Sequence, residues 1–396
     1  MRSYIIYYNY NSNKYKPNEG TYQMRDKILY CKFGTSGIGL CNQLYSLVNA
    51  MVVGSISDGH TLIIVDDFMG DLNSNQYHDA NTIMDFTRIN KMAEEYGVTL
   101  ISKHDIQMTS IKVEYGLAHK NKLADITDIV MNLFYTPNRI CIPIGVPLNR
   151  ILGYDPCKNK RKLIYFTYTI NGKVFQETRD EVIDEEDLEI DFVNLEKKQW
   201  LTLTSITDCK TEIKTFNHFL NNMYFNPIYE QYATEFLKTA MADGGSKLNV
   251  IHLRLEEDAI PFWAGINRLS SREYEEALIR QYTQAIEQNI EPNDGMNVIL
   301  SMNTSNAVTK WMMDNHYKTI QMNKTLVKGR EVNAIIDLII SSRCNHVFIG
   351  NLNPINYHGS TFSYAIFNAL RNKPVKKICI DNDEIYHPAY VVGLDR

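Results

Sequence analysis

The sequence predicts an α/β protein that contains two units, each with parallel strands alternating with helices. Between residues 28 and 66, a short apolar strand, a glycine-bearing loop, a helix and a second strand follow one another, which is the order of a β-α-β unit. From residue 247 onward, short apolar runs alternate regularly with helical patterns, which is typical of a doubly wound sheet. A chain of 396 residues is long enough for two such domains.

In the first unit, one strand is expected near residues 28–33 and a second at 61–66. The loop G-T-S-G-I-G-L between them leads into a helix from about Asn42 to Ser57, which Asp58-Gly59 ends. The apolar residues of this helix recur at helical spacing, at Leu44, Leu47, Val48 and Met51.

The middle of the chain, from about residue 70 to 215, lacks this alternation, and we expect an irregular insertion there. Within it, residues 162–176 predict a β-hairpin that turns at Asn171-Gly172. The acidic stretch that follows, R-D-E-V-I-D-E-E-D-L-E-I-D, is typical of a solvated surface loop. A helix is expected at 227–241.

The second unit is expected to contain strands at 248–255, 297–302, 346–350 and 376–380, and helices at 271–289, 305–315, 331–342 and 361–371. These assignments divide the chain into an N-terminal domain at residues 1–235 and a C-terminal domain at 236–375. A final segment, 376–396, is expected to pack back toward the first domain.

The composition argues against several classes of function. The net charge is −5, from 41 basic and 46 acidic residues, so there is no electrostatic footprint for nucleic acid or for an anionic membrane. No apolar run is long enough for a transmembrane helix, and the N-terminus has no apolar stretch typical of a signal peptide. The 7 cysteines are scattered, without C-x-x-C or metal-ligand spacing, as expected for free thiols in a reducing compartment. We therefore expect a cytoplasmic protein without a metal site.

The strand L-N-V-I-H-L-R-L-E-E-D (248–258) carries the clearest functional signal. It delivers His252, Arg254 and Asp258 at its carboxyl end, which is where ligands bind in an open α/β sheet. Burial of an arginine is costly unless an anion meets it, and the planar guanidinium suits a phosphate or carboxylate. A structural salt bridge between this arginine and an aspartate is the alternative interpretation.

Two glycine-bearing loops give further signals. In V-F-I-G-N-L-N-P-I-N-Y-H-G-S-T-F-S (347–363), Ser360 is placed as the N-cap of a helix, where free amides and hydroxyls can bind an anion. Helix capping alone explains the same residues, but Arg254 on a neighbouring strand favours an anion site. In G-I-G-L-C-N-Q-L (37–44), the glycines allow the backbone to approach a ligand, although their spacing is not the dinucleotide-binding fingerprint.

Taken in order, these motifs resemble those of the GDP-fucose protein O-fucosyltransferases and the plant O-fucosyltransferase-like proteins. The resemblance rests on G-x-x-N-Q (39–43) followed by G-H-T-L-I-I (59–64), on H-L-R-L-E-E-D (252–258), and on F-I-G-N and S-T-F-S within 348–363. It implies a GT-B fold, in which two Rossmann-like domains face a cleft. It also implies an inverting, metal-independent glycosyltransferase without a cofactor. The expected reaction moves L-fucose from GDP-fucose to a hydroxyl of a glycan or protein.

The resemblance also implies roles for individual residues. Arg254 would hold the β-phosphate of the departing GDP, and Asn42 would lie near the reacting sugar. His252 and Asp337 match positions that contact the nucleoside. The other implied donor-binding positions are Gly39, Cys41, Ser360, Thr361, Phe362 and Ser363. Cys41 stands where the family has glycine. The base that deprotonates the acceptor is open between Asp258 and Glu256.

Three alternatives stay open at this point. The donor could be UDP-rhamnose or another nucleotide sugar, since related plant enzymes include rhamnosyltransferases. The chain could also bind a nucleotide sugar without turning it over. A metal-dependent transferase would use an Asp-x-Asp motif, which I-C-I-D-N-D (378–383) fits, although a surface turn explains this segment more simply.

Overall fold

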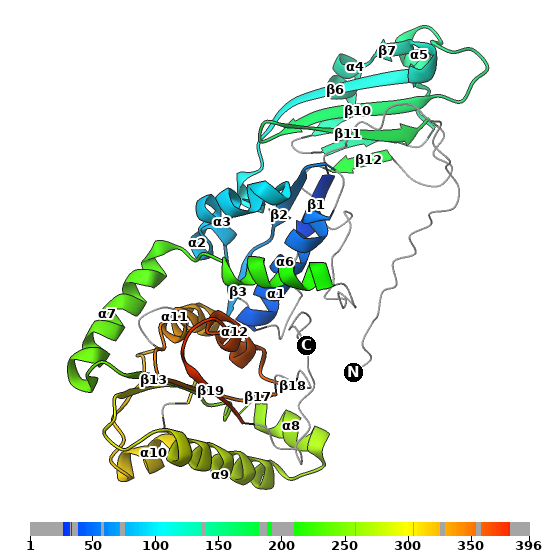
Figure 1. Ribbon diagram of the computed structural model, residues 1–396. Coiled ribbons are helices and arrows are strands. Elements are labelled where there is room, and N and C mark those ends of the chain that lie inside the picture. Colours follow the sequence, from blue (N-terminus) through cyan, green and yellow to red (C-terminus); the bar gives the residue numbers. More distant parts are fainter. Residues whose placement is uncertain are drawn as a thin grey trace.

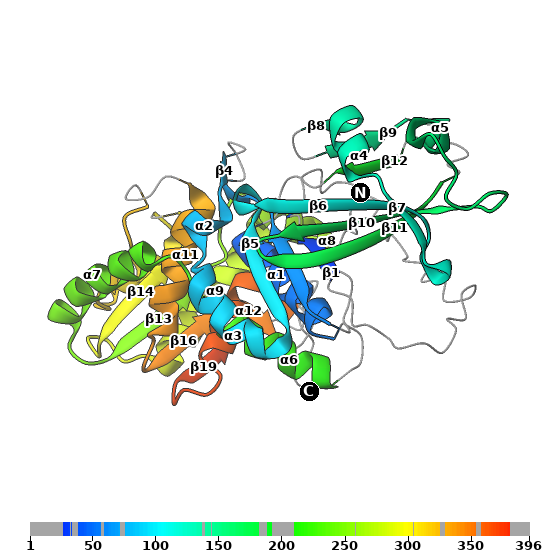
Figure 2. The same ribbon diagram turned by 90° about the horizontal axis from the view of Figure 1, so that it is seen from above.

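The computed structural model describes residues 27–31, 33, 39–56, 59–71, 76–136, 139–143, 145–181, 188–191, 210–257, 259–303, 305–324, 329–353 and 358–380. Within these ranges, three regions follow one another along the molecule (Figure 1). A β-rich insertion lies at one end, a first α/β unit lies in the middle, and a second α/β unit lies at the other end. The view from above shows the same order, with the insertion projecting away from both units (Figure 2).

The first unit is built on a parallel sheet with the strand order β1 (Lys27–Cys31), β2 (Thr61–Val65) and β5 (Val98–Ser102). Helix α1 (Leu40–Ser55) connects β1 to β2, and nearly all of its side chains are buried. It is buried on both sides because the sheet lies against one side, while α6 (Lys210–Asn221) and helices of the second unit contact the other.

Between β2 and β5 the chain forms an antiparallel pair, β3 (Phe68–Asp71) and β4 (Gln76–His78), and then α2 (Ala80–Ile83) and α3 (Phe86–Ala93). The buried amide of Gln43 holds β3 in place, since its Nε2 donates to Met69 O at 3.1 Å and its Oε1 accepts from Met69 N at 2.8 Å. Gln43 of the G-x-x-N-Q motif therefore has a structural role. It fixes β3, the strand that leads toward the second unit.

The insertion is more regular than the sequence predicts, and the expectation of an irregular region at about 70–215 is wrong for its described part. An antiparallel sheet has the order β11 (Lys173–Asp180), β10 (Leu163–Ile170), β6 (Met108–Leu117) and β7 (Lys122–Asp125). A smaller sheet contains β8 (Tyr135–Thr136), β9 (Arg139–Ile142) and β12 (Leu188–Asp191), next to helices α4 (Thr127–Leu133) and α5 (Leu148–Leu152). The sequence analysis identified only the hairpin of β10 and β11 and missed β6, β7 and the smaller sheet.

The hairpin predicted at 162–176 is present, and Asn171 and Gly172 form its turn with φ values of 48° and 78°. Positive φ at both turn residues is the geometry that an Asn-Gly pair favours. The predicted helix at 227–241 corresponds to α7 (Pro227–Gly244), which begins at the Asn226 N-cap and packs against the second unit. The expected domain boundary at 235/236 falls inside this continuous helix.

The second unit contains a parallel sheet with the order β15 (Thr319–Ile320), β14 (Met296–Leu300), β13 (Leu248–His252), β16 (Val347–Gly350) and β19 (Lys376–Cys379). All five residues of β13 and of β14 are buried, as expected for central strands of a covered parallel sheet. The covering helices are α8 (Ala259–Asn267), α9 (Ser271–Asn289), α10 (Ala307–Asp314), α11 (Arg330–Ser342) and α12 (Thr361–Ala369). A short hairpin, β17 (Leu352–Asn353) and β18 (His358–Gly359), precedes α12.

The predicted class, α/β with two parallel sheets in separate units, is confirmed. The expectation for the C-terminal segment 376–396 is wrong in its first part, because Lys376–Cys379 is the edge strand β19 and pairs with β16 in the second sheet. Residues 381–396 lie outside the described ranges, and so does part of the Asp-x-Asp segment. Across the described residues, no helix has the length and apolarity needed to cross a membrane.

Candidate functional site

A cavity of about 240 Å³ lies between the two units, where β13 and β14 end. This is the carboxyl edge of the second sheet, the usual position of a ligand in open parallel sheets. The start of α1 supplies the wall from the first unit, and α8, α11 and α12 supply much of the wall from the second. The lining residues are Gly39, Leu40, Cys41, Asn42, His252, Arg254, Glu256, Trp263, Leu300, Ser301, Met302, Arg330, Glu331, Ala334, Asp337, Ser360, Thr361 and Phe362.

Arg254 lies two residues beyond the end of β13, where one tyrosine hydroxyl fixes the backbone. Tyr282 Oη accepts a hydrogen bond from Arg254 N at 3.0 Å and donates one to His252 O at 2.9 Å. The guanidinium pairs with Glu256, with 2.7 Å between Nη1 and Oε2, and the Arg254 side chain remains 26% exposed. A guanidinium has five N–H donors in a fork, so it can bind an anion in the cavity while one donor stays on Glu256.

His252 forms the floor of the cavity at the end of β13. Its Nδ1 lies 2.6 Å from Ser363 Oγ, and its ring lies 5.1 Å from the Phe362 ring between centroids. Burial, together with the charges of Arg254 and Lys324, lowers the pKa of His252 to about 3. The imidazole is therefore neutral at neutral pH, with one nitrogen as donor and the other as acceptor.

Three helices begin at the cavity, and the N-cap residue of none of them makes a side-chain cap bond, although at α1 the Glu331 carboxylate accepts from the first N–H instead. The N-cap residues are Gly39 for α1, Gly329 for α11 and Ser360 for α12. By contrast, the other helices of eight or more residues whose N-caps the structure describes, α3, α7, α9 and α10, all have a side-chain cap. An uncapped N-terminus offers backbone N–H groups and the positive end of the helix dipole to an anion.

Glu331 is a buried carboxylate that connects the two units at the cavity. Its Oε2 accepts a hydrogen bond from Leu40 N at 2.5 Å, so residue 331 of the second unit satisfies the start of α1 in the first. Burial raises the pKa of Glu331, while the Leu40 N–H and the charges of Arg330 and Arg254 act to lower it. A second bond between the units joins Tyr45 Oη to Thr361 O at 3.0 Å. Together these bonds hold the first turn of α1, which contains Asn42, against the second unit.

One carboxylate oxygen of Asp337 has no protein partner among the residues that the structure describes. Its Oδ2 pairs with Lys324 Nζ, whereas Oδ1 is buried and has no hydrogen-bond partner in the described part of the chain. Burial raises the pKa of Asp337, and the neighbouring Lys324 acts to lower it. A buried acceptor left without a donor costs about 1–3 kcal/mol, so this oxygen is a strong candidate for contact with a ligand N–H or O–H group.

The structure brings most of the predicted site residues into one place. The predicted residues that line the cavity are Gly39, Cys41, Asn42, His252, Arg254, Glu256, Asp337, Ser360, Thr361 and Phe362. Ser363 is buried behind this wall and contacts His252. Asp258 lies outside the described residues, and the carboxylate observed on Arg254 is that of Glu256.

Burial raises the pKa of the Cys41 thiol, and Glu331 adds to this effect, so the thiol is protonated at neutral pH.

Several lining residues were not predicted from the sequence. They include Trp263 on α8, Ser301 and Met302 after β14, and the pair Arg330 and Glu331 at the start of α11. A charged pair at the start of a predicted helix that carries Asp337 was a usable signal for the last two. The contact between Glu331 and Leu40 spans 291 positions, and no local pattern indicates it.

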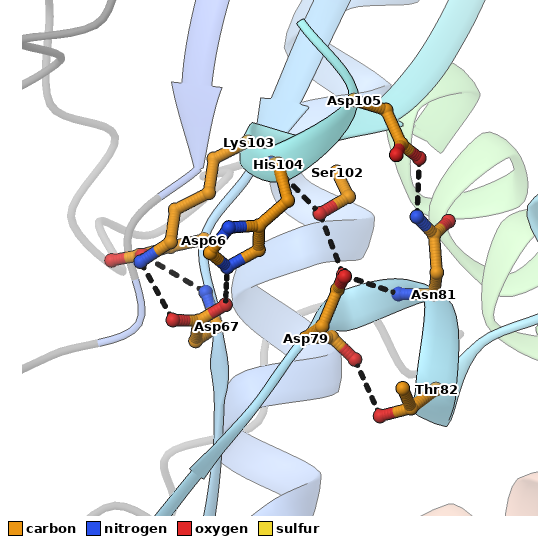
Figure 3. Close-up of polar contacts among 9 residues, drawn as sticks. All are labelled: Asp66, Asp67, Asp79, Asn81, Thr82, Ser102, Lys103, His104 and Asp105. Atoms are coloured by element: carbon orange, nitrogen blue, oxygen red, sulfur yellow. Dashed lines mark hydrogen bonds and ion pairs between the residues drawn. The ribbon is translucent and has the colours of Figure 1, made fainter.

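A second group of polar residues lies at the carboxyl edge of the first sheet, outside the cavity (Figure 3). We call Asp66, Asp67, Asp79, Asn81, Thr82, Ser102, Lys103, His104 and Asp105 the first-sheet cluster. Lys103 Nζ lies 2.8 Å from Asp66 Oδ1 and 2.7 Å from Asp67 Oδ2, and His104 Nε2 lies 2.8 Å from Asp67 Oδ1. No set of three or more His, Cys, Asp or Glu side chains suited to a metal ion occurs among the described residues.

Comparison with known proteins gives structural neighbours only. No protein-family model matches the sequence, and no curated protein matches it. The chain is similar to POFUT1 solved in complex with GDP, at 11% identity and a TM-score of 0.48, covering 92% of this chain and 100% of that one. POFUT1 in complex with GDP-fucose gives 10% identity and a TM-score of 0.45, over 92% and 99%. The fucosyltransferase NodZ from Bradyrhizobium gives 13% identity and a TM-score of 0.41, over 87% and 92%.

Proposed function

We propose that this protein is a glycosyltransferase that moves L-fucose from GDP-fucose to a hydroxyl group of a glycan or protein. The observation that carries the proposal is the cavity at which Arg254 meets the starts of α11 and α12, whose N-cap residues make no side-chain cap bond. One permanent cation and the backbone amides of a helix start suit the diphosphate of a nucleotide sugar. The order of the sequence motifs supports the choice of fucose.

The chemistry of sugar transfer places specific demands on this cavity. As the bond between the sugar and the diphosphate breaks, negative charge grows on the diphosphate and positive charge grows on the sugar ring. Arg254 and the start of α12 would stabilise the diphosphate in this state, because they are held in place before the reaction begins. Asn42, which the bonds from Glu331 and Tyr45 hold at the cavity, would contact the sugar from the opposite unit.

The nucleoside would lie between His252, Phe362 and Asp337. Guanine carries adjacent N–H donors on one edge, and these would bond to Asp337 Oδ1, which has no partner in the described part of the chain. The neutral imidazole of His252 would supply a hydrogen bond without adding charge. A uracil nucleotide would offer only a single ring N–H to the same Asp337 oxygen. These contacts therefore favour GDP over UDP.

The reaction would invert the configuration at the sugar. It would need no metal, because Arg254 and the helix amides would stabilise the negative charge on the diphosphate. The proton acceptor for the incoming hydroxyl stays open between Glu256 and Asp258. Glu256 lines the cavity and pairs with Arg254. As the base, it would both position Arg254 and deprotonate the acceptor hydroxyl. We also propose a cytoplasmic location, on the basis of the scattered cysteines without C-x-x-C spacing.

Release of GDP from GDP-fucose tests this function, measured with EDTA present and with a mixture of glycan and peptide acceptors. We expect release that depends on acceptor in the parent chain and is lost in Arg254→Lys, since lysine keeps the charge but loses the fork. Arg272→Lys is the matched control, because Arg272 lies on α9 and its side chain is 87% exposed. Binding of GDP-fucose without any turnover would instead favour a binding protein, and activity only with UDP-rhamnose would change the donor.

A further inference from the structure

A second cavity, of about 230 Å³, lies between helices of the two units. Helices α1, α3 and α6 supply part of its wall, together with the segment that leads from α6 to α7, and α7, α11 and α12 supply the rest. This cavity shares no lining residue with the first one, so a ligand could occupy it while a nucleotide sugar occupies the other. The proposed reaction makes no use of it.

The interior of the second cavity is apolar. Leu44, Phe225, Ile339 and Ala365 line it, and each of these side chains is no more than 6% exposed. A buried water needs two to four polar partners, which such a surface does not supply. The volume exceeds the roughly 150 Å³ of an apolar cavity that holds a benzene ring, so there is room for an apolar chain of several carbons.

The mouth of the second cavity carries one positive charge that no protein carboxylate offsets. Glu230 lies at the mouth, but its Oε2 pairs with Arg343 Nη2 at 2.6 Å, and the charges of these two residues cancel. Arg88 also lies at the mouth, and its guanidinium carbon is 3.9 Å from the centre of the Tyr224 ring. Arg88 makes no ion pair with any residue that the structure describes.

The stacking on Tyr224 fixes where the Arg88 charge lies. A guanidinium that covers an aromatic ring with its face keeps the N–H groups at its edge directed outward, where an anion can accept from two of them. A cationic ligand would be repelled by Arg88 and would find Glu230 already paired. The charge at the mouth therefore selects an anion, and the interior selects an apolar chain.

We propose that the second cavity is a binding site for a small apolar acid, a molecule with one carboxylate head group and an apolar chain of several carbons. The carboxylate accepts hydrogen bonds from Arg88, and the chain lies among Leu44, Phe225, Ile339 and Ala365. This inference does not depend on the proposed function, because the two cavities have no residue in common.

Calorimetric titration of the full chain with octanoate and with octan-1-ol tests the head group. We expect saturable binding of one octanoate per chain. Arg88→Gln should lower octanoate affinity by about tenfold, as for the loss of one charge-assisted hydrogen bond, and should leave octanol affinity unchanged. Arg272→Gln is the matched control, because Arg272 lies on α9 with its side chain 87% exposed, and both affinities should stay at the parental value.

Filling the cavity tests where the chain lies. Ala365→Leu places extra carbon atoms in the interior and should abolish binding of both octanoate and octanol. Ala369→Leu should do the same from a partly buried position of α12, where a larger side chain disturbs folding less. Circular dichroism and thermal unfolding check that each variant is folded.

Three results would overturn the inference. They are the absence of saturable octanoate binding in the parent chain, the same octanoate affinity in Arg88→Gln as in the parent, and octanoate binding that persists in a folded Ala365→Leu or Ala369→Leu variant. None of them bears on the proposed function, which GDP binding at the first cavity tests separately.

Discussion

The carboxyl edges of the two parallel sheets carry similar residues but differ in how their hydrogen bonds are satisfied. The first-sheet cluster contains a lysine, a histidine and several carboxylates that bond to one another (Figure 3). Ser102 Oγ donates to Asp79 Oδ1 at 2.6 Å, and the same oxygen accepts from Asn81 N at 3.0 Å. At the second sheet, the N-cap residues of α11 and α12 make no side-chain cap bond, and Asp337 Oδ1 has no partner among the described residues.

This difference shows which edge can bind a ligand. Burial acts to raise the pKa of Asp67, but hydrogen bonds from Lys103 and His104 outweigh burial and lower that pKa. The cluster is therefore stabilised by its own contacts and gains little from a further partner. At the cavity, burial dominates for Asp337, whose pKa is raised. Polar groups buried at a cost to stability are typical of functional sites, because a ligand supplies the missing bonds.

The largest expected effect is at Arg254. Replacing it with lysine or alanine should slow sugar transfer by roughly 10²–10³, or about 3–4 kcal/mol, by analogy with removal of one oxyanion donor. The rate of GDP release under saturating donor measures this loss, and circular dichroism checks that the variants are folded. Transfer at the parental rate in both variants would show that Arg254 only forms a structural pair with Glu256.

A matched pair of substitutions tests the comparison between the two edges. Asp337→Asn should weaken GDP binding about tenfold, about 1.4 kcal/mol, because it replaces one of the two carboxylate oxygens of Asp337 with an amide group that cannot accept. Asp67→Asn should leave GDP affinity unchanged, since Asp67 lies in the first-sheet cluster and outside the cavity lining. Titration calorimetry with GDP measures both, and equal losses in the two variants would contradict the distinction drawn here.

The neutral His252 predicts a dependence of stability on pH. Its pKa is about 3 in the folded chain, below the ordinary value of 6.5, so between these pH values the unfolded chain binds a proton that the folded chain does not. Stability is therefore fully present above pH 6.5 and decreases as pH falls toward 3, by about 1 kcal/mol between pH 6 and pH 5. Urea denaturation of the parent and of His252→Gln measures this, and the same slope in both would exclude His252 as its cause.

The two N-cap serines should separate stability from binding, with the smallest effects. Ser270 forms a capping box with Glu273 at the start of α9, whereas the Ser360 side chain makes no cap bond. Ser270→Ala should cost about 1 kcal/mol of stability and leave GDP binding unchanged. Ser360→Ala should do the reverse, with little loss of stability and a measurable loss of GDP affinity. Thermal unfolding with and without GDP distinguishes them, and a similar loss of stability in both would contradict the anion site at α12.

The sequence predicted the second unit well because its signals are local. Strand β13 is a continuous apolar run, and the predicted helix at 271–289 coincides with α9. His252, Arg254 and Ser360 were identifiable because strand ends and helix starts in one parallel sheet meet at one edge. Outside the hairpin at 162–176, the strands of the insertion were missed because they pair over long distances in the sequence, as Gly116 does with Leu163. The pairing of Glu331 with Leu40 depends on how the two units pack, which no pattern within either segment reveals.

The most direct test of the central claim is thermal unfolding of the parent chain with GDP, UDP, dTDP and ADP, each with EDTA and with Mn²⁺. A ligand at 100 times its Kd adds about 2.7 kcal/mol to the stability of the folded state. We predict a shift in Tm that is largest with GDP, persists in EDTA and disappears in Arg254→Ala. A shift that requires Mn²⁺, or the absence of any shift with all four nucleotides, would contradict a metal-independent nucleoside diphosphate site at this cavity.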